Sequence, residues 1–130
     1  MLKSILLASM LSVSLSTAAL AYAADGVPTH TGQSTKGAVL TDSKGMTLYT
    51  FTKDSAGKSA CSGKCAEHWP PLAAAADAKA SGDYSLVTRD DGSKQWAYKG
   101  KPLYTWAKDS KPGDITGDGL ADGAWQLATP

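Results

Sequence analysis

Short runs in which apolar and polar residues alternate recur along this chain and predict strands. In residues 47–55, with the sequence TLYTFTKDS, Tyr49 and Phe51 fall on one face of an extended chain, and Leu48 falls on the other. β-Branched and aromatic residues suit a pleated, half-buried surface. The run leads into Asp, Ser, Ala and Gly, which are typical of turns. The pattern therefore predicts a strand followed by a turn.

The same phrase occurs again as PLYTWAKDS in residues 102–110. Each copy has a tyrosine, a second aromatic residue and an aspartate at one spacing. The matched pairs are Tyr49 and Tyr104, Phe51 and Trp106, and Asp54 and Asp109, and further along the chain Trp69 matches Trp125. Two such matches at nearly one offset indicate an internal duplication. We therefore expect two similar halves in which the repeated tyrosines are buried in equivalent places.

The alternating runs predict six short strands separated by turn residues. These strands are expected at residues 38–41, 46–53, 84–88, 95–98, 102–106 and 124–128. Lys99 and Gly100 form a tight turn within a three-stranded meander. The alanine-rich stretch near 71–80 allows at most a short helical turn between the halves. The predicted fold class is all-β, a small antiparallel β domain of two pseudo-repeated halves.

Residues 1–23 have the features of a secretory signal peptide. Lys3 precedes an apolar run diluted by serine and alanine, and Ala21-Tyr22-Ala23 forms a small-x-small cleavage site. We therefore expect the mature protein to begin at Ala24 or within about three residues of it.

The mature chain is expected to consist of a leader and one domain. Residues 24–36 are polar, contain Gly and Pro and lack periodicity, so they are expected to be flexible. A single β domain then covers 37–130, with repeat halves at about 37–72 and 84–130.

The charge of the mature chain argues against some partners. Removal of Lys3 with the signal leaves as many Lys and Arg as Asp and Glu, without a basic cluster. Nucleic-acid binding needs Lys and Arg gathered against phosphates and is therefore disfavoured. Because no cysteine lies near the cleavage site, we expect no stable membrane anchor after cleavage. The expected location is the periplasm or the exterior of the cell.

Several motifs together resemble those of a known family. They are the repeated Tyr-x-(Phe/Trp)-x-x-Asp phrase, a Cys-x-x-x-Cys, a Trp-Pro-Pro-Leu, and a closing Gly-Asp-x-Thr-Gly-x-Gly that precedes Trp125. The chain resembles the bacterial secreted-repeat family, catalogued as predicted lipoproteins with a Tyr-x-(Phe/Trp/Tyr)-x-x-Asp motif, over roughly residues 37–130. The resemblance implies export and a duplicated β fold, but the function of the family is unassigned. This chain lacks the lipidated cysteine, which leaves a soluble periplasmic or secreted form.

Cys61 and Cys65 are the only cysteines of the chain. In an oxidising compartment, cysteines this close favour a disulfide across a small loop. An alternative adds His68, because two thiolates and an imidazole form a soft donor set that suits copper. The spacing is close to that of copper electron-transfer sites without matching it, and it differs from the Cys-x-x-Cys-His of c-type haem. The disulfide is the main prediction, with copper as the alternative.

The Gly- and Asp-rich loop near the C-terminus partly resembles the calcium loop of an EF-hand. Oxygen-bearing side chains occupy loop positions 1, 3, 5 and 9, namely Asp114, Thr116, Asp118 and Asp122, and a glycine occupies position 6. Trp125 stands at position 12, where an EF-hand has a bidentate carboxylate. A structural turn is therefore the main interpretation, and calcium binding is the alternative.

Asp54 and Asp109 form a candidate pair of catalytic carboxylates. Each follows its strand directly into a turn, so we interpret both as Asx-turn residues that accept nearby backbone N–H groups. The aromatic residues are interpreted as core rather than as a ligand-stacking face. They are Tyr49, Phe51, Trp69, Tyr84, Trp96, Tyr98, Tyr104, Trp106 and Trp125.

The sequence favours a binding protein over an enzyme. It contains no Ser-His-Asp or Gly-x-Ser-x-Gly arrangement, and His68 is the only histidine outside the leader. We expect an exported non-enzymatic β-module, without a cofactor, that binds or scaffolds an envelope component or a small ligand. The alternative is a copper-binding, thiol redox or electron-transfer accessory that uses Cys61, Cys65 and His68.

Overall fold

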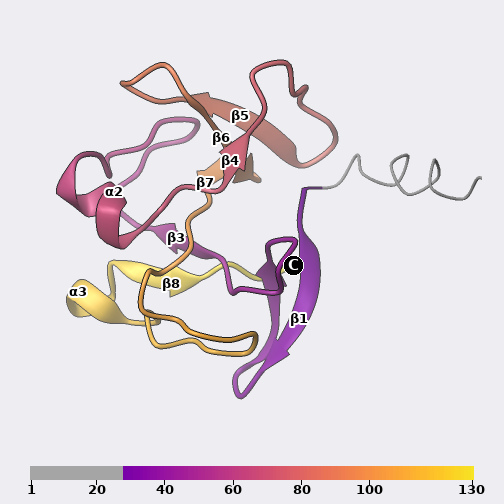
Figure 1. Ribbon diagram of the computed structural model, residues 1–130, viewed down its shortest axis with the longest axis vertical. Coiled ribbons are helices and arrows are strands. Elements are labelled where there is room, and N and C mark those ends of the chain that lie inside the picture. Colours follow the sequence, from indigo (N-terminus) through magenta and orange to yellow (C-terminus); the bar gives the residue numbers. More distant parts are fainter. Residues whose placement is uncertain (1–27) are drawn as a thin grey trace, which may run out of the picture.

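Residues 28–130 are described by the computed structural model of the protein (Figure 1). The predicted signal peptide, the expected start at Ala24 and the first residues of the predicted leader lie outside the described residues. The rest of the leader forms β1 (His30–Ser34), which pairs antiparallel with β2 (Gly37–Thr41). The expectation of a flexible leader is therefore wrong for β1. Backbone pairing stabilises this strand although its sequence lacks an apolar alternation.

A hairpin turn connects β2 to β3 (Tyr49–Phe51), as the sequence predicts. The carboxylate Oδ1 of Asp42 accepts the backbone N–H groups of Lys44 and Met46, both at 2.9 Å. Thr41 and Thr47 then form an antiparallel bridge across the hairpin. The turn fixes the register that places Leu48 and Tyr49 in the interior, where both are fully buried.

The second half contains the predicted meander, which consists of β5 (Tyr84–Thr88), β6 (Lys94–Tyr98) and β7 (Lys101–Pro102). All neighbouring pairs are antiparallel, and β6 lies between β5 and β7. Lys99 and Gly100 both have positive φ, 51° and 84°, which is the requirement of a type I′ hairpin turn. The predicted meander is therefore confirmed, although the regular part of its last strand is shorter than expected.

The short helical elements lie elsewhere than predicted. The alanine-rich stretch begins with strand β4 (Ala73–Ala74), which pairs with β6, whereas a helical turn forms at α2 (Lys64–His68) and another at α3 (Leu120–Gly123). The helical turn expected near 71–80 is thus corrected. The preceding Leu72 donates its N–H to the carbonyl of Leu103 at 2.9 Å, and this sheet pairing overrides the helix propensity of alanine.

The two halves are joined through β3. On one side it pairs antiparallel with β8 (Trp125–Leu127), the last strand of the chain. On the other side Tyr49 and Tyr104 exchange two backbone hydrogen bonds, of 2.8 and 3.0 Å. Figure 1 shows β3 and β8 side by side, with β7 next to them. The repeated tyrosines therefore face each other at the junction.

Each half ends by pairing with the other half. Leu72, near the end of the first repeat, donates its N–H to the carbonyl of Leu103 in the second. Ala128, near the end of the second repeat, donates its N–H to the carbonyl of Leu48 in the first, also at 2.9 Å. These equivalent bonds mean that the halves exchange their terminal segments and are not independent units.

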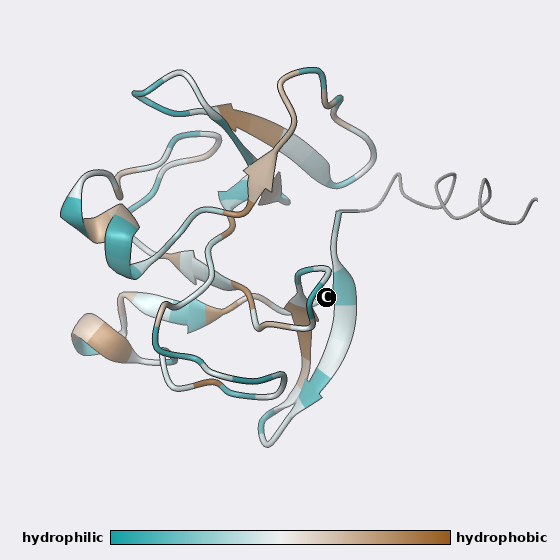
Figure 2. Cartoon of the chain, viewed as in Figure 1, coloured by the Kyte–Doolittle hydropathy of each residue, from teal (hydrophilic) through white to brown (hydrophobic). Residues whose placement is uncertain are grey.

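The buried apolar side chains form two clusters at this junction. One contains Leu40, Leu48, Leu103 and Ala128, and the other contains Tyr49, Cys61, Trp69, Tyr104, Ala124 and Trp125. Figure 2 shows hydrophobic stretches in β2 and β5 and mostly hydrophilic residues at the turns. The all-β class and the duplicated antiparallel architecture are confirmed. Within residues 28–130, no helix has the length and apolar character needed to span a membrane.

Candidate functional site

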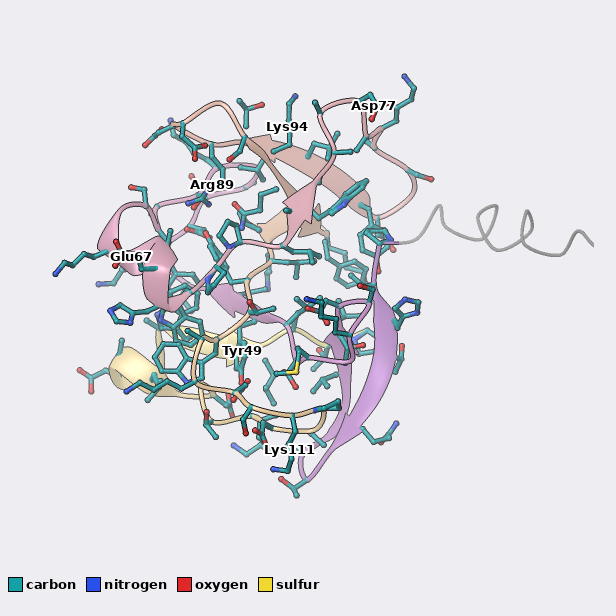
Figure 3. The ribbon with its side chains drawn as sticks, viewed as in Figure 1. Tyr49, Glu67, Asp77, Arg89, Lys94 and Lys111 are labelled. Carbon is teal, nitrogen blue, oxygen red and sulfur yellow. A yellow bond between two sulfur atoms is a disulfide. The ribbon has the colours of Figure 1, made fainter. Side chains whose placement is uncertain are left out.

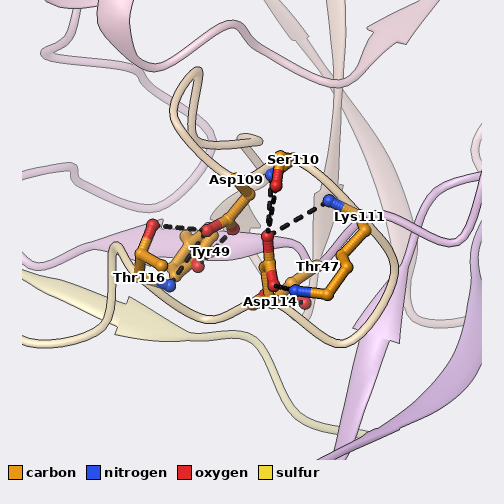
Figure 4. A network of polar contacts seen from close by, with 7 residues as sticks. All are labelled: Thr47, Tyr49, Asp109, Ser110, Lys111, Asp114 and Thr116. Carbon is orange, nitrogen blue, oxygen red and sulfur yellow. Dashed lines mark hydrogen bonds and ion pairs between the residues drawn. The ribbon is translucent and has the colours of Figure 1, made fainter.

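The first notable polar contact of the interior joins Tyr49 to Asp109 (Figure 4). The Tyr49 hydroxyl donates to Oδ2 of Asp109 at 2.6 Å, and both residues are buried. The other carboxylate oxygen, Oδ1, accepts the backbone N–H of Thr116 at 2.9 Å and its hydroxyl at 2.6 Å. The Tyr49 oxygen in turn accepts the N–H of Gly117 at 3.2 Å. The carboxylate therefore ties a strand of one half to a loop of the other.

A second contact of the same kind joins Tyr104 to Asp54. The Tyr104 hydroxyl lies 2.7 Å from Oδ2 of Asp54, and Oδ1 accepts the backbone N–H of Ala60 at 2.7 Å. The Ser59 hydroxyl lies 2.6 Å from the Tyr104 oxygen. Tyr104 is fully buried, like Tyr49. The two contacts are equivalent positions of the repeat, so the prediction that the tyrosines are buried in equivalent places is confirmed.

Each tyrosine thus bonds to the aspartate of the other copy of the phrase. We call these two contacts the clasps: Tyr49 with Asp109, and Tyr104 with Asp54. The Asx-turn interpretation of the aspartates needs correction, because their backbone partners lie six and seven residues further along the chain. An Asx turn uses a donor two residues away. The aspartates instead close long loops and hold the two halves together.

The clasps shift the ionisation of their members. Burial and the bond to Asp109 raise the pKa of Tyr49 well above its ordinary value. Burial raises the pKa of Tyr104 to about 12, with a further rise from Asp54 and an opposing effect from Ser59. Burial also raises the pKa of Asp54, against the donors Ala60 and Tyr104. Both phenols are therefore protonated donors at neutral pH.

Four aromatic rings form a continuous stack beside the clasps. Phe51 lies on Trp125 with ring centroids 4.2 Å apart, Trp125 lies on Trp69 at 3.7 Å, and Trp69 lies on Trp106 at 4.2 Å. The central pair, Trp69 and Trp125, is buried, whereas Phe51 and Trp106 at the two ends are half-buried. This order follows the repeat, because the inner pair and the outer pair each consist of equivalent positions.

The clasp tyrosines approach the inner tryptophans edge-on. Tyr49 lies 5.3 Å from Trp69 and Tyr104 lies 5.1 Å from Trp125, with ring planes at 80° and 89°. Such T-shaped contacts are a favoured geometry for aromatic pairs. The backbone of Gly117 lies directly against the stacked rings, since a Cβ atom there would lie 2.7 Å from the ring of Trp69. The clasps and the stack therefore form one compact unit.

The predicted disulfide between Cys61 and Cys65 is confirmed, with an S–S distance of 2.05 Å. Cys61 is buried in the aromatic cluster and Cys65 is half-buried at α2. His68 ends α2 with its side chain exposed. While the disulfide is intact, the sulfur atoms are not available as the thiolates of the copper alternative. Across residues 28–130, no three His, Cys, Asp or Glu side chains are grouped so that they could hold a metal ion.

The structure does not bring the residues of the calcium alternative together around one point. The Asp114 carboxylate accepts from Ser110 and Lys111, which lowers its pKa, chiefly through Lys111. Asp118 pairs with Lys36, 2.6 Å from its Nζ, and Thr116 donates to Asp109. Asp122 is exposed within α3. These side chains act in turn and loop contacts, in agreement with the structural interpretation.

Arg89 is a half-buried residue with three hydrogen-bond partners that sequence reasoning missed. Its guanidinium donates to the Cys61 carbonyl at 2.6 Å, to Gln95 Oε1 at 2.7 Å and to Ser59 Oγ at 3.1 Å. Figure 3 places Arg89 near the loop before α2, while Glu67, Asp77, Lys94 and Lys111 extend outward and Tyr49 lies near the centre. Arg89 is the only arginine of the chain, and this was the one sequence feature that could have drawn attention to it. Arg89 supports the loop that carries the second clasp.

A surface groove also escaped sequence reasoning. A cavity of about 410 Å³ opens between the end of β3, the β6–β7 turn and β8, and a second cavity of about 320 Å³ shares four of its lining residues. The shared residues are Thr50, Lys99, Lys101 and Gln126. The half-buried Phe51 contributes apolar surface to the larger cavity, and the clasp carboxylate of Asp54 also lines it. The two cavities form one groove, lined by two exposed lysines next to apolar surface.

The fold and site define a duplicated β-module whose repeat motif clasps the two halves together. The chain belongs to the family described as a secreted repeat of unknown function, which matches residues 30–73 and 85–129. These two matches coincide with the two halves and place β1 within the first repeat. Comparison with curated proteins and with solved structures gives no match.

Proposed function

We propose that this secreted repeat is a non-enzymatic binding module of the bacterial envelope, with the groove between β3, β7 and β8 as its binding face. The proposal rests on the hydrogen bonds that the polar groups of the repeat motif make. Each clasp phenol is bonded to its clasp carboxylate, and each carboxylate also accepts a backbone N–H; Asp109 is buried, and Asp54 is half-buried at the edge of the groove. The repeat motif thus acts in folding, and recognition is assigned to the surface.

The chemistry of the groove favours an acidic ligand with some apolar surface. Lys99 in the β6–β7 turn and Lys101 at the start of β7 are both exposed, two residues apart. The half-buried Phe51 offers apolar contact, and Gln126 offers both a donor and an acceptor. A few polar groups around an apolar floor are typical of ligand sites. Carboxylate-bearing peptides and envelope polymers have this chemistry.

A titration with an acidic probe tests this proposal. A hexaglutamate peptide added to isotope-labelled protein should shift the backbone amide resonances of Thr50 and Gln126, and the peptide should be recovered unchanged in mass. Lys99→Gln with Lys101→Gln should abolish the shifts at low salt. A matched variant, Lys44→Gln with Lys79→Gln, removes two exposed lysines outside the groove and should keep them. Equal effects of the two double variants would contradict the proposed face.

A thiol redox role is the second candidate, and the half-exposure of Cys65 favours it. Cys65 is half-buried whereas Cys61 is fully buried, so Cys65 is the more accessible end of the disulfide. Reduction would free two thiols, of which that of Cys65 lies three residues from His68 in the sequence, and this set suits copper. Copper bound by the reduced protein, with affinity lowered by His68→Ala, would support this role. Copper binding that is indifferent to His68 would argue against it.

A further inference from the structure

The aromatic stack has two ends that differ chemically although they are equivalent in the repeat. Trp106 stands at one end and Phe51 at the other, and both are half-buried. An indole ring loses an electron far more easily than a benzene ring. The Trp106 end is therefore the point at which an oxidant in solution can withdraw an electron from the stack.

We propose that this stack carries one-electron oxidising equivalents from Trp106 through Trp69 and Trp125 to Tyr49 and Tyr104, whose protons pass to Asp109 and Asp54. This activity goes beyond ligand binding in the groove. The rings along the route have centroids 4.2, 3.7, 5.3 and 5.1 Å apart, so each electron step crosses a close contact. The substrate class is a one-electron oxidant, such as a peroxyl radical.

The clasps supply what a tyrosine needs in order to be oxidised. Loss of an electron makes a phenol a strong acid, so the electron leaves readily only if a base accepts the proton. Oδ2 of Asp109 lies 2.6 Å from the Tyr49 oxygen, and Oδ2 of Asp54 lies 2.7 Å from the Tyr104 oxygen. The raised pKa of each phenol keeps its proton in place until oxidation.

The step balances in atoms and electrons. The oxidant takes one electron from Trp106, and an electron that moves from Tyr49 through the stack then reduces the resulting indole radical cation. The O–H bond of Tyr49 breaks, and its proton forms an O–H bond on Asp109. The products are a neutral tyrosyl radical, a carboxylic acid and the reduced oxidant. A one-electron donor such as a quinol restores the phenol, and the proton returns from Asp109.

Two other tyrosines of the chain serve as internal controls. Tyr84 and Tyr98 form a separate aromatic group with Trp96, with centroids 5.1 and 6.4 Å from Tyr84. The Tyr84 hydroxyl bonds to the hydroxyl of Thr29, which is not a base at neutral pH. These phenols have similar chemistry and stand outside the stack. They are not expected to hold the radical.

Flash-quench oxidation of the full mature protein tests the proposal. A photogenerated ruthenium(III) tris-bipyridine complex serves as the oxidant, and electron paramagnetic resonance identifies the radical. We expect a tyrosyl signal that Tyr49→Phe and Tyr104→Phe each reduce by half. Tyr84→Phe with Tyr98→Phe should leave it unchanged. A signal that survives loss of both clasp tyrosines, or that disappears with the control pair, would overturn the proposal.

Two further measurements keep the test decisive if a clasp variant fails to fold. In wild-type protein, deuterium oxide should slow tyrosyl formation, because the proton moves with the electron. Trp106→Phe makes the two ends of the stack alike and should remove the fast phase of oxidation, whereas Phe51→Trp should increase its amplitude. Tyrosyl formation that is insensitive to both deuterium and Trp106→Phe would rule out the route.

Discussion

Replacing Tyr49 by phenylalanine removes one clasp and leaves the ring in place. The change deletes the oxygen that donates to Asp109 at 2.6 Å and accepts from Gly117 at 3.2 Å. A hydrogen bond to a charged group contributes about 1.5–3 kcal/mol to stability, and removing one partner leaves the buried carboxylate short of a donor. Asp109 keeps its two bonds from Thr116, which moderates the loss. We expect the free energy of unfolding to fall by about 2 kcal/mol.

Urea denaturation followed by tryptophan fluorescence measures this loss, since the stacked tryptophans report on the junction. For a domain of this size, about 2 kcal/mol corresponds to a decrease in Tm of roughly 10 °C. Tyr84→Phe is the matched control, because it removes a half-buried hydroxyl whose partner is the neutral hydroxyl of Thr29. It should lower stability by about 1 kcal/mol or less. If Tyr49→Phe costs no more than Tyr84→Phe, the clasp has no special role in stability.

Three further predictions rest on the structure and a fourth on the sequence. Gly117→Ala should destabilise the fold by about 1–3 kcal/mol, because the new Cβ meets the ring of a stacked tryptophan at 2.7 Å; an unchanged urea midpoint would refute the close approach. Cys61→Ser with Cys65→Ser should lower Tm but leave the β signature in circular dichroism, whereas loss of that signature would make the disulfide essential for folding. Because the pKa of Tyr104 is raised to about 12, its contribution to stability is complete below about pH 10 and is lost as pH rises towards 12; a urea midpoint that stays constant over that window would contradict this. Intact mass of the exported protein should show a chain that begins at Ala24 or within about three residues of it, and an uncleaved chain would refute the signal peptide.

Local patterns predicted much of this fold. The all-β class, the meander and the disulfide follow from motifs that depend on near neighbours in sequence, and the duplication follows from the recurrence of one such motif. The Lys99-Gly100 turn shows why, since its backbone conformation is a property of two residues. The strand β1 could not be predicted in this way. Its sequence is polar, and it is a strand only because β2 supplies hydrogen-bond partners.

The candidate site depended on long-range pairing, which a single sequence does not reveal. The repeat identified Tyr49, Tyr104, Asp54 and Asp109, but it did not indicate which aspartate each tyrosine contacts. A local reading assigned the aspartates to Asx turns, whereas the folded chain places each opposite the other repeat. The lysine groove was missed for the same reason, because its walls come together only when the last strand pairs with β3.

The exchange between halves can be tested most directly by two double-mutant cycles in urea denaturation. One combines Tyr49→Phe with Asp109→Asn, and the other combines Tyr49→Phe with Asp54→Asn. Residues in contact couple by about 0.5–3 kcal/mol, whereas residues without shared partners are close to additive. We expect a coupling of at least about 1 kcal/mol for Tyr49 with Asp109, and near additivity for Tyr49 with Asp54. Coupling to Asp54, with additivity towards Asp109, would mean that each repeat closes on itself and would contradict the clasped fold.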